Sequence, residues 1–225
     1  MPPHARCLVG LAACPDERDA TVRAHRTARC RRSGLPWRIL SDNGPPWGTP
    51  HPPQALPALS IWLLRLGVGV SHGRPHHPQT QGKVERCHRT RKAERLRPSA
   101  DHDLAEGQAA FAAWRETDNL ERPHHALELD TPASRSRPSP RPCPEALPPV
   151  AYGPGELVRT VHRGGQISDR GRWSFVSQAL RGQDVARRPT PTDGVLAAFC
   201  CHHQLGELDL RRADAALRPP APAKG

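Results

Sequence analysis

The sequence predicts a mixed α/β chain, a sheet with flanking helices, followed by a small β-barrel-like domain. Strand-like apolar runs alternate with helical stretches over the first 71 residues. A segment with seven prolines in 19 residues, at 131–149, separates this part from a series of short strand-like pieces. We therefore expect a core at 1–130, a linker at 131–149, a small barrel at 150–211 and a disordered tail at 212–225.

The first elements follow from apolar runs and charge order. Residues 6–14 form an apolar run that is too short for an ordinary helix, so we predict a strand. The stretch 16–34 carries acidic residues first and basic residues last, the order that a helix dipole favours. WRILS at 37–41 predicts a short buried strand, and Asp-Asn-Gly at 42–44 predicts a turn at its end.

Three more helices and one strand are expected before the linker. The apolar stretch 58–66 predicts a buried helix that ends at Gly67, and VGVS at 68–71 predicts a strand. Residues 82–96, dense in Lys, Arg and Glu, predict a second helix. Asp101 is expected to cap a third helix, which carries a stripe at helical spacing: Leu104, Gln108, Phe111 and Trp114.

Beyond the linker, short β-type segments alternate with turns such as Gly164-Gly165. This spacing is typical of a small β-barrel. The segments are ELVRTVH, RWSFVS, QDVARRP and VLAAFCCHHQLGELDL.

The charge balance indicates a polyanionic partner. The chain has 33 Lys and Arg against 22 Asp and Glu, a net charge of +11 with His neutral. Because each cation that neutralises a phosphate releases a condensed counterion, nucleic acid is the first candidate. The alternative is that the arginine excess only solvates the surface.

Several other classes of protein are disfavoured. No apolar run is long enough for a membrane span, and no signal peptide or phosphate-binding loop is evident, so we expect a cytoplasmic protein without a membrane or small-molecule partner. The seven cysteines are scattered, which favours reduced thiols. Zinc-type side chains follow one another at 200–203, but neighbouring strand residues alternate faces, which disfavours one tetrahedral site.

Two carboxylates carry the chemical hypothesis. Asp42 follows a predicted strand and Glu85 lies in the first turn of a predicted helix, with 42 residues between them. Carboxylates brought together in this way can hold Mg²⁺, which prefers hard oxygen ligands and serves phosphoryl transfer. The alternative is that Asp42 only forms a turn and Glu85 only solvates a helix.

Three motifs follow one another in a specific order: SDNGPPWG, HPQTQGKVER and RPHHAL. Together they resemble the integrase-type DDE transposases of bacterial insertion sequences, which are relatives of retroviral integrases. The resemblance runs from about His4 to Asp209. It implies a ribonuclease-H-like core in which a triad of acidic residues binds a pair of Mg²⁺ or Mn²⁺ ions for DNA strand cleavage and transfer.

Within this resemblance, Asp42 matches the second acid and Glu85 the third. Helical spacing places Arg89 and Lys92 on the same face as Glu85, with Arg86 displaced from it. The resemblance implies contact with element ends and target DNA, and action as a homo-oligomer. The cations that it places on the phosphate backbone are Lys83, Arg86, His88, Arg89 and Lys92.

The sequence also departs from the family pattern. The first acid, on the first strand of the family's core, has no counterpart in the chain, so we expect this fragment to be inactive alone. The alternatives are a DNA-binding remnant, which holds DNA by the basic helix and the barrel, and a product that folds poorly. His76, Cys87 and Asp118 stand where the family usually has aromatic residues, which predicts a loss of apolar core area.

Overall fold

A computed structural model describes residues 4–41, 44, 46–48, 56–72, 85, 89–90, 103–169, 171–212 and 217–218. The chain divides into two compact units. The first unit consists of Met1–Pro36 and Gly73–Cys143, and the second of Trp37–His72 and Pro144–Gly225. Each unit is described by itself below.

The first unit contains helix α1, which spans Asp19–Ser33 and confirms the helix predicted from charge order. Asp19 lies in its first turn, and its last turn is basic. Gly34 ends the helix with a φ of 75°, and its N–H donates to the carbonyl of Cys30 at 2.8 Å. A Cβ at Gly34 would collide with Ser139, so glycine is required here for space as well as conformation.

The strand predicted at 6–14 is wrong, because this segment pairs with side chains instead of with a neighbouring strand. The N–H of Leu8 donates to Oδ1 of Asn119 at 2.8 Å, and Nδ2 of Asn119 donates back to the Leu8 carbonyl at 3.1 Å. The N–H of Ala13 donates to Oε1 of Gln108 at 3.1 Å. Side-chain amides thus satisfy backbone groups that a sheet would otherwise satisfy.

Those amides belong to helix α4, which spans Leu104–Leu120. Its cap is Asp103, whose carboxylate accepts a hydrogen bond from the N–H of Glu106 at 2.8 Å. The predicted cap, Asp101, is therefore wrong by two residues, and it lies outside the described residues.

The buried face of α4 confirms only part of the predicted stripe. Trp114 is 7% exposed, and Gln108 and Phe111 are half-buried, whereas Leu104 is 50% exposed. Leu104 opens the helix directly after its cap, before the buried face begins. Asp118 is buried one turn beyond Trp114 and continues that face.

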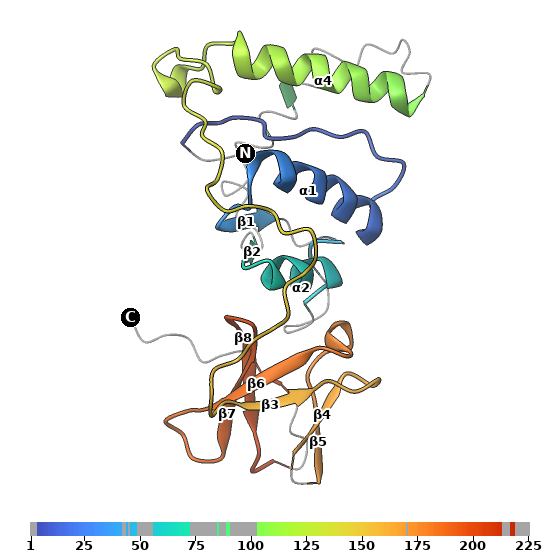
Figure 1. Ribbon diagram of the computed structural model, residues 1–225, viewed down its shortest axis with the longest axis vertical. Helices are drawn as coiled ribbons and strands as arrows, with labels where there is room; N and C mark the ends of the chain where they lie inside the picture. Colours follow the sequence, from blue (N-terminus) through green and yellow to red (C-terminus); the bar gives the residue numbers. More distant parts are fainter. Residues whose placement is uncertain are drawn as a thin grey trace. The chain divides into compact units, whose positions relative to one another are not determined.

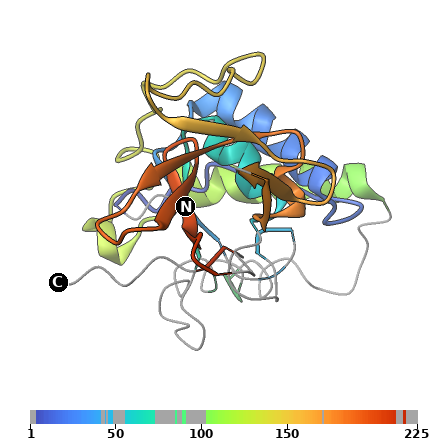
Figure 2. The same cartoon turned by 90° about the horizontal axis from the view of Figure 1, so that it is seen from below.

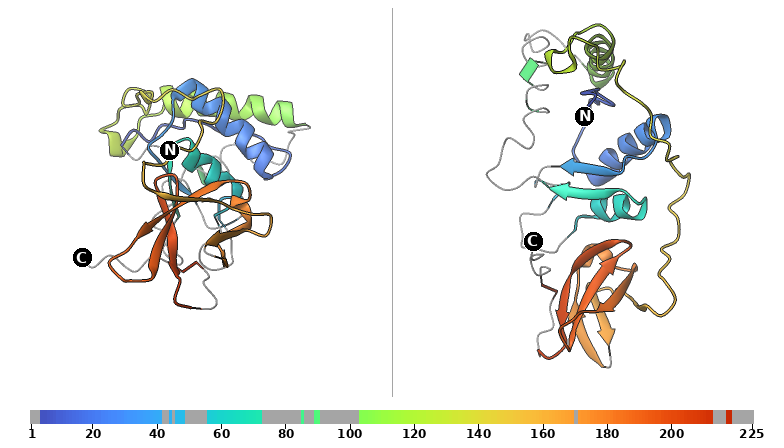
Figure 3. Two further views of the ribbon diagram at one scale, coloured as in Figure 1. Left: turned by 60° about the horizontal axis from the view of Figure 1, so that its bottom comes forward. Right: turned by 90° about the vertical axis from the view of Figure 1, so that its left-hand side faces the viewer.

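The second unit contains two short parallel strands, β1 at Arg38–Ser41 and β2 at Gly69–His72. Helix α2, Ala58–Arg65, connects them and lies beside them (Figure 3). All three predicted elements are confirmed. The residues of α2 from Leu59 to Leu64 are buried, whereas only Ile39 is buried in β1, so the prediction of a buried strand holds for one side chain.

The rest of the second unit is rich in strands, which confirms the β-type pattern beyond the linker. Strands β3, β6, β7 and β8 form an antiparallel sheet in that order, and β4 pairs with β5 as a separate hairpin (Figures 1 and 2). The strands are Leu157–Thr160 (β3), Gln166–Asp169 (β4), Arg172–Phe175 (β5), Asp184–Pro189 (β6), Val195–Cys200 (β7) and His203–Asp209 (β8).

Sheet and hairpin share one apolar core, to which Ile167 of β4, Val185 of β6 and Leu208 of β8 contribute. Leu217 is also buried in this core, and Arg218 pairs with Glu207 of β8. The segment beyond 212 therefore contributes to the fold where it is described. The mixed α/β class with a strand-rich carboxy-terminal part is confirmed.

Candidate active site and nucleic-acid interface

The parallel strands β1 and β2 end at one edge of their sheet. Ser41, the last residue of β1, lies opposite His72, the last residue of β2. In α/β proteins, ligands bind outside the carboxyl ends of parallel strands. Asp42 is the next residue along the chain after Ser41, so the sequence assigns it to this edge. Asp42 itself lies outside the described residues.

The chain segment after this edge, around Trp47, is hydrogen-bonded to α2. The N–H groups of Trp47 and Gly48 both donate to the carbonyl of Gly44 at 2.9 Å, which closes a tight turn. The hydroxyl of Ser60, which is 2% exposed on α2, donates to the Trp47 carbonyl at 3.3 Å. A buried side chain of the helix thus fixes the path of the chain a few residues beyond Asp42.

Glu85, the second predicted carboxylate, has helical backbone and an exposed side chain. Arg89, four positions later, also has helical backbone and is exposed. The other predicted DNA-contacting residues lie outside the described part of the chain: Lys83, Arg86, His88 and Lys92. The pairing of Glu85 with Asp42 stays a prediction.

No three His, Cys, Asp or Glu side chains gather into a possible metal site within the described ranges. At 200–203 the chain reverses between β7 and β8, with Cys201 and His202 in the turn.

Positive charge dominates the exposed ionic groups of the strand-rich part. Among its described Asp and Glu residues between 150 and 212, only Asp193 is exposed. Glu156 is paired with Arg188 at 2.6 Å, and Asp169 with Arg187 at 2.7 Å. In the described part of the same range, 150–212, the exposed arginines are Arg159, Arg163, Arg172, Arg181, Arg211 and Arg212.

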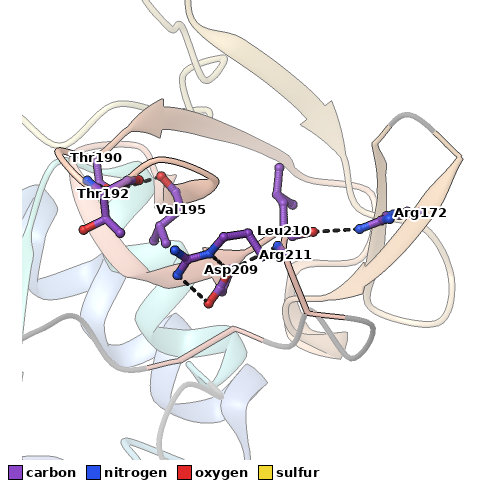
Figure 4. A network of polar contacts seen from close by, with 7 residues as sticks. All are labelled: Arg172, Thr190, Thr192, Val195, Asp209, Leu210 and Arg211. Atoms are coloured by element: carbon purple, nitrogen blue, oxygen red, sulfur yellow. Dashed lines mark hydrogen bonds and ion pairs between the residues drawn. The ribbon is translucent and has the colours of Figure 1, made fainter.

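Two of these arginines are held at the end of β8 (Figure 4). Arg211 makes two hydrogen bonds to the Asp209 carboxylate, at 2.8 and 3.0 Å, and this pairing lowers the pKa of Asp209 to about 2. Nη1 of Arg172 donates to the carbonyl of Leu210 at 2.7 Å. In the adjoining β6–β7 turn, the hydroxyl of Thr190 donates at 2.9 Å to the carbonyl of the residue that opens β7.

Strand β5 turns its aromatic side chains outward. Trp173 is 53% and Phe175 46% exposed, while Ser174 between them is 2% exposed. The ring of His162 meets Trp173 edge to face, with centroids 4.9 Å apart. Exposed aromatic rings beside arginines are typical of surfaces that bind nucleic acid. The sequence predicted a DNA-binding barrel at 150–211 but not these two aromatic residues, although the alternation of RWSF, with serine between two aromatics, indicates that both rings share one face.

Two family models match the chain. Residues 66–132 match the model described as integrase core domain, and residues 156–216 match the model described as IS481 family transposase, C-terminal domain. Over these residues the chain is similar to domains of integrases and of insertion-sequence transposases. The resemblance drawn from the sequence motifs is therefore confirmed. The first match ends at residue 132, at the start of the 131–149 region, and the second match lies entirely beyond that region.

Solved structures of integrases are also similar. The catalytic core domain of BIV integrase is 26% identical, with 53% of this chain and 71% of that chain covered and a TM-score of 0.38. The simian T-cell lymphotropic virus intasome, in complex with PP2A regulatory subunit B56 gamma, is 17% identical, with 84% of this chain and 64% of that chain covered and a TM-score of 0.41. The resemblance to integrase-type transposases rests on the two family models.

None of the helices in the described ranges is both long and apolar enough to cross a bilayer.

Proposed function

We propose that this chain belongs to the catalytic machinery of a DDE transposase, which cleaves and transfers DNA strands at the ends of an insertion sequence. The observation that carries the proposal is the integrase-core match over 66–132, which contains Glu85 and the HPQTQGKVER motif. The second match, over 156–216, supports an insertion sequence as the source of the DNA ends. The matched domains belong to proteins of DNA transposition and integration.

Asp42 and Glu85 would hold the divalent cation, Mg²⁺ or Mn²⁺. Their donor chemistry fits, since both side chains are carboxylates, and carboxylate oxygens are the hard ligands that such a cation prefers. Such an ion, when bound, polarises the phosphodiester and favours an oxygen nucleophile. The proposed role of the two residues is to bind and orient this cation. Replacing either carboxylate by its amide would remove the negative charge at nearly the same side-chain volume.

The phosphate backbone would lie along the Glu85 helix, where Arg89 presents an exposed guanidinium one turn from the carboxylate. Lys83, Arg86, His88 and Lys92 complete this proposed surface. The exposed arginines and aromatics of β5 and its surroundings would provide a second, sequence-independent contact with DNA. We also propose that the protein acts as a homo-oligomer.

The first acid of the family has no counterpart among these 225 residues. We therefore propose that these residues alone bind DNA without cutting it, and that cleavage requires a third carboxylate. DNA binding without cleavage is also the second candidate function, which the outward-facing cations of the strand-rich part favour.

The test adds to the chain the first strand and first acid of an integrase-core relative, and measures cleavage of labelled element ends in Mg²⁺. The extended chain is expected to cut, and its Asp42→Asn and Glu85→Gln variants to fall to background. Glu121→Gln, an exposed carboxylate beyond α4, is the matched control and should retain cleavage. Cleavage that survives Glu85→Gln would refute the assignment of the third acid.

A further inference from the structure

Strands β4 and β5 form a two-stranded hairpin whose inner face contributes to the apolar core (Figure 1). Ile167 of β4 lies opposite Ser174 of β5, and both side chains are buried. Because neighbouring residues of a strand point to opposite faces, Trp173 and Phe175 share the outer face of the hairpin, where both are exposed. Two large aromatic side chains are thus accessible to a ligand on one face of the hairpin.

A third ring restricts the indole of Trp173. The ring of His162 contacts the Trp173 ring edge to face, with centroids 4.9 Å apart and an angle of 79° between the planes. The backbone of His162 is itself fixed, since its N–H donates to the Gln166 carbonyl at 2.7 Å and its carbonyl accepts the N–H of Gly165 at 2.9 Å. More than half of the Trp173 surface stays exposed despite this contact. A ligand that stacks on a restricted ring loses less conformational entropy on binding.

Arg159 places a positive charge beside Trp173. Ser168 of β4 pairs with Trp173, and Nε of Arg159 donates to the carbonyl of Ser168 at 3.2 Å. Asp169 lies 3.8 Å from Arg159, but the closer partner of Asp169 is the buried Arg187, at 2.7 Å. The Arg159 side chain is 45% exposed. Its charge is therefore only partly neutralised within the protein and is accessible to an anionic ligand.

The wider surroundings of the rings are also cationic. Arg163 is exposed in the turn that follows His162, and Arg172 is exposed directly before Trp173. Among the described Asp and Glu residues at 150–212, only Asp193 is exposed. A second copy of this chain would bring the same excess of positive charge to this face. The partner that fits combines a flat apolar group with negative charge, and a nucleotide with an unpaired base has both.

Base stacking distinguishes a single DNA strand from a duplex. In a duplex the faces of the bases are covered by their neighbours in the stack, and only base edges, sugars and phosphates meet a protein surface. In a single strand the face of a base can stack on an aromatic side chain, and sheets with outward aromatic residues bind nucleic acid in this way. A single strand therefore uses the exposed Trp173 ring more fully than a duplex does.

We propose that the outer face of the β4–β5 hairpin binds single-stranded DNA, with an unpaired base stacked on Trp173 and the adjoining phosphates on Arg159 and Arg163. Phe175 extends this face by about 7 Å along β5, for a neighbouring base. The inference rests on the proposed function, because cleavage and transfer of DNA strands expose unpaired nucleotides at the cut ends. It adds which form of DNA the strand-rich part binds.

The test measures binding of the full chain to three labelled ligands by fluorescence anisotropy at one salt concentration. The first is an oligodeoxythymidylate of about 12 nucleotides, within the usual site size for single-strand binding. The second is an abasic strand and the third a duplex, both of the same length. The wild type is expected to bind the abasic strand about tenfold more weakly than the thymidylate strand, because the phosphates remain and only the bases are missing.

Variants separate stacking from charge. Trp173→Ala should weaken binding of the thymidylate strand about tenfold and leave binding of the abasic strand and the duplex unchanged, and Trp173→Phe should restore most of the loss. Arg163→Gln should weaken binding of all three ligands by a similar factor, because each of them presents phosphates. Trp37→Ala is the matched control, since Trp37 is 72% exposed directly before β1, and its three affinities should equal those of the wild type.

Equal affinity of the wild type for the thymidylate and abasic strands would refute the stacking contact, while binding of the duplex would leave the proposed DNA function intact. A similar loss of all three affinities in Trp173→Ala would show a structural role for the ring and would also refute it. Loss of self-association in Trp173→Ala, measured by ultracentrifugation, with unchanged affinity for the thymidylate strand would assign this face to a second copy instead. Failure of the wild type to bind any of the three ligands would overturn the proposed function together with this inference.

Discussion

A buried ion pair in the strand-rich part gives a sharp test of how burial decides the strength of an electrostatic interaction. Arg187 of β6 is 1% exposed, and its Nη1 lies 2.7 Å from Oδ2 of Asp169 in β4, which is 13% exposed. Nε, Nη1 and Nη2 of Arg187 have no hydrogen-bond partner of adequate geometry among the described residues. Asp169 therefore supplies most of the compensation for a buried cation.

The perturbation is Asp169→Ala, which leaves the Arg187 charge buried and unpaired. Removal of one partner of a buried pair costs about 3–5 kcal/mol of unfolding free energy, because desolvation of the remaining charge is no longer offset. Arg159, whose Nη2 is 3.8 Å from Asp169, is a second cation on the same carboxylate and relaxes in solvent after the change. The double variant Arg187→Met with Asp169→Leu removes both charges and should lie within about 1 kcal/mol of wild type.

The matched control is an exposed pair at the same distance. Nη2 of Arg135 lies 2.7 Å from Asp130, with the two side chains 44% and 50% exposed. Asp130→Ala should cost at most about 1 kcal/mol, because water screens this pair. The assay is native-state hydrogen exchange of the β6 amides together with urea unfolding. Equal costs for Asp169→Ala and Asp130→Ala would show that burial does not set the energy of the inner pair.

Three further outcomes are expected. Asn119→Leu removes both hydrogen bonds to the 6–14 segment and should destabilise it by about 2 kcal/mol, at about 1 kcal/mol per bond, measured as faster amide exchange there. Arg89→Ala should weaken DNA binding and reduce the slope of log K against log salt by about 0.9, and an unchanged slope would contradict a phosphate contact. Alkylation of Cys201 should reach half its maximal rate near pH 7, since its pKa is lowered to about 7, and Arg65→Gln should move that midpoint upward.

Local pattern predicted most elements of the fold but not their non-local partners. Charge order and apolar runs were enough for α1, α2 and the strands of the second unit, because those signals lie within each element. The 6–14 segment has the composition of a strand, yet Asn119 and Gln108 satisfy its backbone from more than 90 positions away. No window of sequence around 6–14 contains that information.

The candidate functional residues also separate into those that a short local motif predicts and those whose properties depend on distant residues. The motifs predicted Asp42 and Glu85 because each motif is short and contiguous, and the integrase-core match includes Glu85. The pKa of Cys201 is lowered by Cys200 and by the charge of Arg65, and Arg65 lies on α2, far from Cys201 in the sequence. The sequence therefore showed two adjacent cysteines but not the environment that distinguishes one from the other.

Asp118 stands where the sequence resemblance predicts an aromatic residue, and this acidic replacement has an ionic partner in the structure. The position is buried, at 5% exposure, as expected where the family has an aromatic residue. Its carboxylate is paired with Arg122 at 3.3 Å, one turn along, and the same guanidinium lies over the ring of Trp114 at 5.7 Å. Arg122 is the first residue of the RPHHAL motif, so this motif supplies the charge that makes a buried carboxylate tolerable. An aromatic residue restored at 118 would regain apolar area, but it would also remove the ion pair between Asp118 and Arg122, and the two positions have to be considered together.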